Sequence, residues 1–346
     1  MHNEPVLVGL SGGIDSSVAL FLLKNLGHPV FGVSLIFTPG RYNRCCAEES
    51  IRWAERLCAQ LGVPFFSLPV GEEFEKQIIR PFVEEYARAR TPNPCILCNP
   101  LIKWRYLLMW ADKLGVPKIA TGHYARVVEV NGEYQLFRAK DREKDQSYFL
   151  ARLSSVALAR TIFPLGDYTK EEVREIAKKL PLTPDRPESQ EVCFVPDDDL
   201  AGFLRSRGLA VSSGPTYDIH GNLLGYHPPA VFTIGQRHYL GVATGKPMYV
   251  VKIIPGTNAI VIDSSAYSGS LLADNISWVN DVPKLPARFK ARIRYRHTPA
   301  DCYVSFDSGF LRVDFDTPQW AITPGQYVTI YDDDRVLGCA RIIEKL

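Results

Sequence analysis

The first part of the chain alternates short apolar runs with segments of helical period. Apolar runs at 6–10, 30–37, 64–70 and 116–122 predict buried strands. Apolar residues at helical spacing predict helices over 15–27, 47–62, 72–90 and 169–180. The last of these begins at Thr169, a favourable helix cap, and ends before Pro181. Buried strands separated by helices predict an α/β fold with a doubly wound parallel sheet.

The pattern becomes one of short alternating strands after about residue 205. Turns rich in Gly, Asn and Pro separate these strands, which is typical of small β-barrels or sandwiches. An earlier Asn131–Gly132 pair between two alternating segments predicts a β-hairpin that decorates the α/β unit. We therefore expect three domains, an α/β domain at 1–205 and two small β-barrels at 206–275 and 276–346.

Composition narrows the class of protein without deciding its partners. The chain has 346 residues, of which 46% are apolar and 23% charged, as in ordinary globular proteins. A net charge of +2 neither requires nor excludes a nucleic-acid partner. No apolar run has the length of a membrane span, and the N-terminal residues lack the features of a signal peptide. We expect a cytoplasmic protein without membrane association, whose eight cysteines are thiols, metal ligands or catalysts.

A glycine- and serine-rich loop, Ser11–Ser17, lies between the first strand and the first helix. Glycines allow the backbone to approach a ligand closely, and the amides at a helix start favour an anion. Asp15 stands where a carboxylate can cap the helix or hold a magnesium ion. The loop lacks the Gly-Lys-Ser/Thr of the Walker motif. Phosphate binding is favoured over an ordinary glycine-rich turn.

Three cysteines offer sulfur or metal chemistry. Cys95 and Cys98 form a C-x-x-C that follows two prolines, and Cys193 is distant in sequence. One pair and one single cysteine fit a structural zinc site poorly, because such sites use four ligands. Three thiols in one cleft could carry and resolve a persulfide, or could hold an iron–sulfur cluster with one open iron. The alternative for Cys193 is a buried packing residue. Adjacent Cys45 and Cys46 receive no role.

A run of basic residues in the last domain suggests a nucleic-acid surface. Residues 284–297 contain six basic and no acidic residues among Lys, Arg, Asp and Glu. Five cations, at 288, 290, 292, 294 and 296, alternate with apolar residues, so on a strand they would share one face. Such a stripe favours RNA contact over a merely solvated sheet face. Arg41, Arg44, Lys103 and Arg105 would extend it.

The loop sequence SGGIDS after an apolar strand resembles the PP-loop of ATP pyrophosphatases. This resemblance implies an adenine nucleotide alpha hydrolase-like fold and cleavage of ATP between the α- and β-phosphates. Further motifs make the resemblance specific: GLSGGIDSSVAL, RTPNPCILCNPLIKW, ATGHYAR, KDQSYFL, FPLGDYTKEEVREIA, SQEVCF, TIGQR and PGQYV. Their order and spacing are similar to those of the tRNA-specific 2-thiouridylases over nearly the whole chain. That family uses ATP to activate the 2-oxygen of the wobble uridine in certain tRNAs and replaces it with sulfur.

The resemblance implies roles for individual residues of this chain. ATP would contact Gly9, Leu10, Ser11, Gly12, Gly13, Ile14, Asp15, Ser16, Leu35 and Gly122. Cys98 would be the nucleophile and Cys193 the persulfide carrier, and the two could form a disulfide. The target base would lie against Asn93, Pro94 and Cys95. Other parts of the tRNA would contact His123, Lys144, Asp145, Gln146, Arg294, Tyr295 and Gln326. For His123 the alternative from residue type alone is a core histidine, although its place after a strand and Gly122 favours a site.

Position 95 distinguishes two variants of this family. Some members carry Asp there, where a carboxylate can act as a base. The Cys found here resembles members in which Cys95, Cys98 and Cys193 bind a 4Fe–4S cluster whose fourth iron takes the sulfur. As a hypothesis we favour the cluster over the persulfide route.

The sequence therefore predicts an enzyme, an ATP- and Mg²⁺-dependent tRNA-uridine 2-sulfurtransferase that releases AMP and pyrophosphate. Its partners would be tRNA and either a sulfur-donor protein or free sulfide. One alternative is a PP-loop ligase or amidotransferase that acts on a small molecule. Another is a non-catalytic RNA- or iron–sulfur-binding protein. The sequence indicates neither the set of tRNAs, nor the immediate sulfur donor, nor the oligomeric state.

Overall fold

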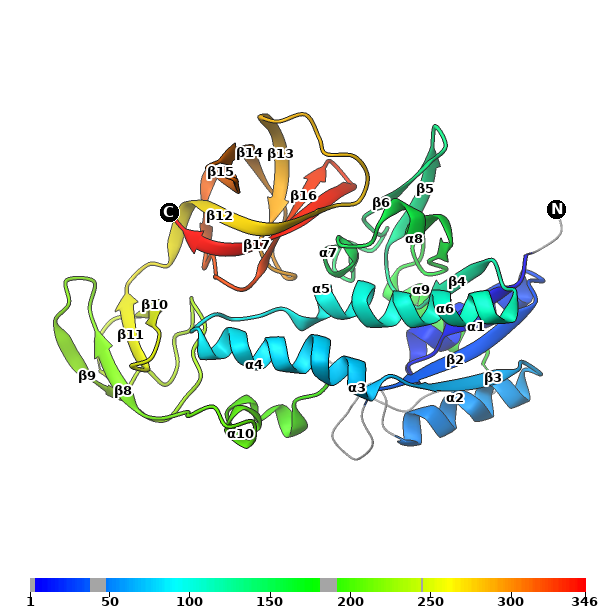
Figure 1. Ribbon diagram of the computed structural model, residues 1–346, viewed down its shortest axis with the longest axis horizontal. Helices are drawn as coiled ribbons and strands as arrows, with labels where there is room; N and C mark the ends of the chain where they lie inside the picture. Colours follow the sequence, from blue (N-terminus) through cyan, green and yellow to red (C-terminus); the bar gives the residue numbers. More distant parts are fainter. Residues whose placement is uncertain (1–3, 38–47, 181–191, 244) are drawn as a thin grey trace.

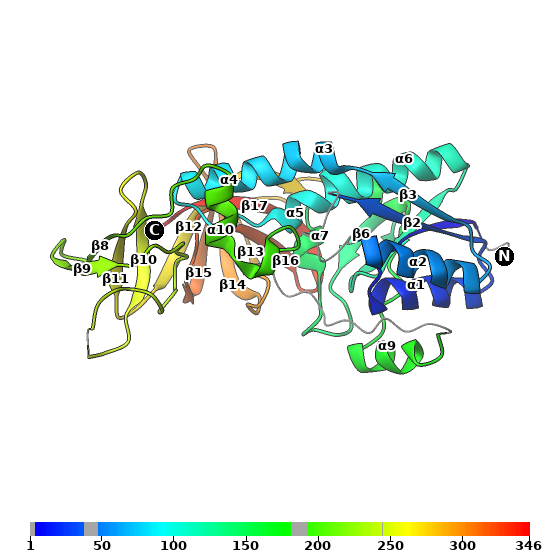
Figure 2. The same cartoon turned by 90° about the horizontal axis from the view of Figure 1, so that it is seen from below.

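The computed structural model describes residues 4–37, 48–180, 192–243 and 245–346. Figure 1 shows three units, which we call the α/β unit, the central unit and the barrel. The central unit lies at the far end of the molecule from the parallel sheet of the α/β unit (Figures 1 and 2). The barrel packs beside the helices that run between those two ends. No helix in the described ranges is both long and apolar enough to cross a membrane.

The sheet of the α/β unit is wholly parallel, in the order β3-β2-β1-β4-β7. Its strands are β1 (Val6–Gly9), β2 (Val30–Ile36), β3 (Phe65–Pro69), β4 (Lys118–Thr121) and β7 (Thr161–Ile162). Val6 and Val8 pack in one apolar cluster with Leu20, whereas Leu7 belongs to a second cluster. Both faces of the sheet are therefore covered, and the predicted α/β class is confirmed.

Helices α1 (Ile14–Asn25) and α2 (Glu48–Gln60) cover one face of this sheet, and α6 lies on the other (Figure 2). On that second side the chain runs through α3 (Gly71–Phe74), η1 (Glu75–Ile79), α4 (Arg80–Ala87), α5 (Pro94–Cys98), η2 (Asn99–Trp104) and α6 (Arg105–Leu114). The single helix predicted over 72–90 is thus interrupted by the π-helical turn η1. Pro100 lies in the first turn of η2, and Pro81 lies in the first turn of α4, just after η1; proline lacks the amide proton that an α-helix needs.

The predicted helix that starts at Thr169 is α9 (Lys170–Ala177). The Thr169 hydroxyl accepts from the Glu172 amide, and the Glu172 carboxylate accepts from the Thr169 amide, which makes a complete capping box. Shorter helices complete the description: α7 (Ser147–Leu150), α8 (Ser155–Ala159), η3 (Pro196–Asp198) and α10 (Leu200–Ser206).

The hairpin predicted at Asn131–Gly132 is formed by β5 (Arg126–Val130) and β6 (Glu133–Phe137). Both turn residues have positive φ, 52° and 82°, as the tight turn of a hairpin requires. Strand β6 also pairs with β17 of the barrel, because Leu136 lies opposite Val336. The hairpin therefore joins the α/β unit to the barrel, which local pattern did not predict.

The central unit is a small four-stranded sheet in the order β10-β11-β8-β9. Its strands are β8 (Gly214–Tyr217), β9 (Leu223–His227), β10 (Tyr249–Ile254) and β11 (Ala259–Asp263). Phe232, Ile234, Val250 and Ile260 form its apolar core.

The barrel closes because β12 pairs with both β15 and β17. Its strands are β12 (Tyr267–Trp278), β13 (Ala287–Arg292), β14 (Ala300–Asp307), β15 (Phe310–Trp320), β16 (Tyr327–Asp332) and β17 (Arg335–Lys345). Strand β12 runs through the expected domain boundary at 275. The predicted boundaries of the three domains stay a prediction.

Candidate active site

The loop between β1 and α1 forms a tight cradle. Gly12 has a φ of +76°, and a Cβ there would lie 2.7 Å from Ser50. A Cβ on Gly122, just after β4, would lie 2.5 Å from the Ser16 amide nitrogen. Only glycine fits at these two positions, so the end of β4 lies directly against the loop.

Serines hold the loop in this conformation. The hydroxyls of Ser16 and Ser17 donate to the Gly13 carbonyl at 3.1 and 2.8 Å. The Ser11 amide donates to Ser16 Oγ at 3.2 Å. Gly13 is the N-cap of α1 in an extended conformation, which refutes the alternative of Asp15 as the cap. The start of this 12-residue helix is a site that favours phosphate.

Asp15 is held from behind by a buried cation and a buried phenol. Its Oδ1 accepts from Lys170 Nζ at 2.7 Å and from Tyr124 Oη at 2.9 Å. Lys170 is 2% exposed, whereas Asp15 is 33% exposed. The carboxylate therefore combines access to solvent with a fixed orientation, which suits a ligand of magnesium.

The residues expected to contact ATP converge at one edge of the sheet. Gly9–Ser16 follow β1, and Gly122 follows β4, its neighbour in the sheet. Leu35 lies near the end of β2, on the other side of β1, and is buried. Ligands bind at this carboxyl edge in open α/β sheets, so the arrangement fits a nucleotide site.

The C-x-x-C segment forms the short helix α5, with Asn93 as its N-cap. Cys95 is exposed and Cys98 is buried. Their spacing of three residues places both thiols on adjoining parts of the helix surface. Cys98 belongs to the large apolar cluster of the α/β unit, and Cys193 packs at the border of that same cluster.

The residue after Cys193 anchors this distant segment. The Phe194 ring lies 5.6 Å from the Phe74 ring and 5.0 Å from the Phe82 ring. Phe74 and Phe82 belong to α3 and α4, and α5 packs against η1, which joins them. Cys193 and Cys98 are thus brought to one helical layer, which sequence spacing could not show. Cys45 and Cys46, with Arg41 and Arg44, lie outside the described residues.

Among the described residues, no three His, Cys, Asp or Glu side chains come together as a metal-binding group. Cys95, Cys98 and Cys193 are all described, and they do not form such a set as placed. The three-cysteine cluster site stays a prediction.

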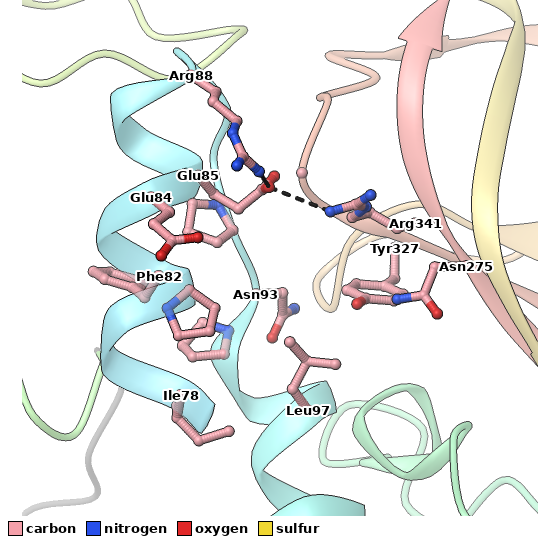
Figure 3. Close-up of a pocket in the computed structure, with 14 residues that line it drawn as sticks. Ile78, Phe82, Glu84, Glu85, Arg88, Asn93, Leu97, Asn275, Tyr327 and Arg341 are labelled. Carbon is pink, nitrogen blue, oxygen red and sulfur yellow. Dashed lines mark hydrogen bonds and ion pairs between the residues drawn. The ribbon is translucent and has the colours of Figure 1, made fainter. Parts of the chain in front are cut away.

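A cavity of about 260 Å³ lies between α4, the 92–97 segment and the barrel (Figure 3). Asn93, Pro94 and Leu97 line it on one side, and Tyr327 and Arg341 line it on the other. Two of the three residues expected against the target base therefore face this cavity, but neither Cys95 nor Cys98 is among its described lining residues.

Charged side chains fix the wall of this cavity. Glu85 Oε1 accepts from Arg341 at 3.2 Å and from Arg88 at 3.4 Å, as the dashed lines in Figure 3 mark. Arg341 also pairs with Asp274 at 2.7 Å. These contacts hold α4 against the barrel beside the cavity.

All three units meet at Thr91, just before the C-x-x-C segment. The Thr91 amide donates to the Pro324 carbonyl at 3.0 Å, and its hydroxyl lies 3.0 Å from that of Thr233. Gln326 Nε2 donates to the carbonyls of Thr91 at 2.9 Å and Pro92 at 3.3 Å. Gln326, expected against tRNA, thus holds the segment that leads to the thiols.

The expected tRNA segment 144–146 is fixed by buried contacts. Asp145 is fully buried and accepts from Arg292 at 3.0 Å and from Arg138 at 3.3 Å. Gln146 exchanges hydrogen bonds with the backbone of Tyr124, at 2.8 and 2.9 Å. The buried carboxylate of Asp145 therefore holds the neighbouring residues of this segment in place.

The remaining residues expected against tRNA are mostly enclosed. His123 Nδ1 lies 2.8 Å from the Thr121 hydroxyl. Burial, followed by the charge of Lys103, holds the pKa of His123 well below 6.5, so its ring is neutral at physiological pH. Arg294 Nη2 donates to the Ile234 carbonyl at 2.8 Å, and burial lowers its pKa. Tyr295 lies against Phe149, with ring centroids 4.6 Å apart.

The predicted continuous basic stripe is wrong. Strand β13 ends at Arg292, so the last two cations lie beyond it, and Arg292 itself is buried. Lys290 pairs with Asp301 at 2.8 Å, and Arg288 pairs with Asp316. The adjacent strand β14 and the strand beyond it, β15, supply these carboxylates, and a single strand's sequence does not reveal cross-strand partners.

Sequence reasoning missed Lys170, Tyr124 and Thr91. One signal was available for Lys170, which occupies the first position of a capped helix. A cation there opposes the helix dipole, so a tertiary partner for it should have been sought.

Comparison with known proteins matches the whole chain. Three family models align with it: "tRNA methyl transferase HUP domain" over residues 4–197, "tRNA methyl transferase PRC-barrel domain" over 202–264 and "Aminomethyltransferase beta-barrel domain" over 268–342.

The tRNA-specific 2-thiouridylase MnmA of Carboxydothermus hydrogenoformans is 45% identical to this chain, and the alignment covers 99% of this chain and 98% of the relative. Those of Heliobacterium modesticaldum and Syntrophotalea carbinolica are 42% and 41% identical. They cover 99% and 97% of this chain, and 93% and 97% of the respective relatives.

Proposed function

The chain belongs to the tRNA-specific 2-thiouridylase family, and we propose that it thiolates the wobble uridine of a subset of tRNAs in two stages, the first of which consumes ATP. The uridine carbonyl oxygen is a poor leaving group. In the first stage its 2-oxygen attacks the α-phosphate of ATP, and pyrophosphate leaves. In the second stage sulfur attacks C2 of the base, and AMP leaves.

The loop cradle supports the first stage. Backbone amides at the start of α1 favour the phosphates, and Asp15 offers a fixed, partly exposed carboxylate to Mg²⁺. When bound, the ion would offset the charge of the departing pyrophosphate. The target base would leave the anticodon stack to reach this region, as base-modifying enzymes generally require.

The thiols support the second stage by a persulfide route. The terminal sulfur of a Cys193 persulfide would bond to C2 as AMP departs. The Cys98 thiolate would then attack Cys193 Sγ, form a disulfide and leave the sulfur on the base. The observation that carries this proposal is the shared apolar cluster of Cys98 and Cys193 beside α3, η1 and α4.

The 4Fe–4S hypothesis has less support, because the three cysteines as described do not gather as a ligand set. Anaerobic purification with iron and sulfide analysis tests it. Iron-free protein with full activity would remove the cluster from the account. For the persulfide route we propose that a donor protein transfers sulfane sulfur to the Cys193 thiol, or that free sulfide attacks Cys193 Sγ of the Cys98–Cys193 disulfide, which forms the persulfide and releases the Cys98 thiolate. On the cluster hypothesis the sulfur supplied would be sulfide. We also propose a cytoplasmic location, where the tRNA substrate is found.

The function is tested by incubating the protein with tRNA transcript, ATP, Mg²⁺ and sulfide under nitrogen. Mass spectrometry of the nucleosides should detect 2-thiouridine. Cys98→Ala and Cys193→Ala should abolish it, whereas Cys339→Ala, a change at a buried packing thiol of the barrel, should not. Pyrophosphate release without thiolation would favour a small-molecule ligase. tRNA binding without either reaction would favour a non-catalytic module.

A further inference from the structure

Lys170 is a buried cation whose side chain forms an ion pair with Asp15 of the phosphate loop. It lies at the first position of α9, where the helix dipole disfavours a positive charge. Its Nζ nevertheless lies 2.7 Å from Asp15 Oδ1, and its side chain is 2% exposed. A buried ammonium is costly without a partner, so Asp15 and Lys170 stabilise each other.

Tyr124 donates to the same oxygen from a second direction. Its hydroxyl lies 2.9 Å from Asp15 Oδ1, and its ring centroid lies 5.8 Å from Lys170 Nζ. Two donors on Oδ1 restrict rotation of the carboxylate and so define the direction in which Oδ2 points. Neither donor lies on the helix that carries Asp15, so the arrangement depends on tertiary packing.

The support behind Lys170 is rigid. The capping box at Thr169 fixes the first turn of α9, and Val173 packs with Val18 of α1 in one apolar cluster. The Lys170 amide donates to Asp141 at 2.9 Å. This last contact uses the backbone, so a change of the Lys170 side chain leaves it in place.

We propose that Lys170, with Tyr124, is a positioning residue of the nucleotide site that acts through Asp15. The ammonium offsets the charge of Asp15, which would otherwise repel the phosphates, and both donors hold its free oxygen toward the cradle. The inference rests on the proposed function, in which pyrophosphate leaves from this loop. The first turn of α9 therefore has a role in the activation of ATP.

The test measures tRNA-dependent pyrophosphate release as a function of ATP and Mg²⁺. Lys170→Met should lower kcat/KM for ATP about 100-fold, the order expected when a reacting group is misplaced. Lys170→Arg should recover part of that loss, and Tyr124→Phe should cause a smaller one. Lys140→Met is the matched control, because Lys140 pairs with Glu172 on the same helix but is half-exposed. It should behave like the wild type.

A double-mutant cycle separates positioning from general destabilisation. If Lys170 acts through Asp15, Lys170→Met should add no further loss to Asp15→Asn. tRNA affinity should be unchanged in each variant. Wild-type rates in Lys170→Met, or losses that multiply in the double variant, would overturn the proposal. If Lys170→Met does not fold, the cycle is run with Tyr124→Phe. A wild-type protein that releases no pyrophosphate with tRNA would instead count against the proposed function.

Discussion

Asp145 of the α/β unit and Arg292 of the barrel form an ion pair of 3.0 Å in which the side chains are 0% and 5% exposed. Asp145 belongs to the segment expected to contact tRNA, and Arg292 is the last residue of β13. The pair therefore joins the nucleotide-binding part of the molecule to the barrel at the surface where the substrate is expected.

Asp145→Asn should destabilise the protein strongly. The change leaves Arg292 buried without its counter-charge, and removal of one partner of a buried pair typically costs about 3–5 kcal/mol. The free energy of unfolding in urea measures the effect. Arg288→Met is the control on the same strand, since the Arg288–Asp316 pair is largely exposed and should shift the midpoint little. Equal effects of the two substitutions would contradict the structural role given to Asp145.

Gly325→Ala should impair thiolation by displacing the segment before the thiols. Gly325 has a φ of +93°, and a Cβ there would lie 2.9 Å from the Thr91 carbonyl group. Gly309→Ala is a matched control, because Gly309 has a φ of +88° but nothing within 4 Å of the added carbon. Both variants carry backbone strain of about 1 kcal/mol, but only Gly325→Ala should lower the thiolation rate beyond that stability change. Similar rates in the two variants would refute this.

Buried cysteines should resist alkylation in the folded protein. Burial raises the pKa of Cys58 and Cys339 to about 12, so at pH 8 only about one molecule in ten thousand carries either thiolate. Cys95 is exposed and should react with iodoacetamide before the buried cysteines of the described residues. Peptide mass spectrometry over time checks this order. Labelling of Cys339 as fast as Cys95, without unfolding, would show that the apolar cluster shared by the barrel and the α/β unit is open.

Stability should fall on acidification in part through His297. Burial, followed by the charges of Arg294 and Arg292, lowers the pKa of His297 from 6.5 to about 4. Between these values the unfolded chain binds a proton that the folded chain does not, so the free energy of unfolding decreases as pH falls through this window. His297→Gln should flatten that slope and leave the slope near pH 8 unchanged. Urea unfolding at several pH values measures both, and parallel curves throughout would rule the effect out.

Periodicity predicted the strands at 6–10 and 30–37 and the helix after Thr169 because each signal is local. The glycine-rich motif located the phosphate loop, because its glycines reflect a backbone conformation that other residues cannot adopt. The basic stripe failed for the opposite reason. Arg288 and Lys290 meet carboxylates from two other strands of the barrel, which the sequence of β13 does not contain.

By itself the sequence determined the α/β class, the hairpin at Asn131–Gly132, the loop before α1 and the family to which the motifs belong. The tertiary structure alone decided that Lys170 and Tyr124 hold Asp15, that Asp145 is buried against Arg292, and that Thr91 joins three units. The physical reason is that backbone conformation and burial leave a periodic trace along the chain. The pairing of one charge with another depends instead on how separate elements pack in space.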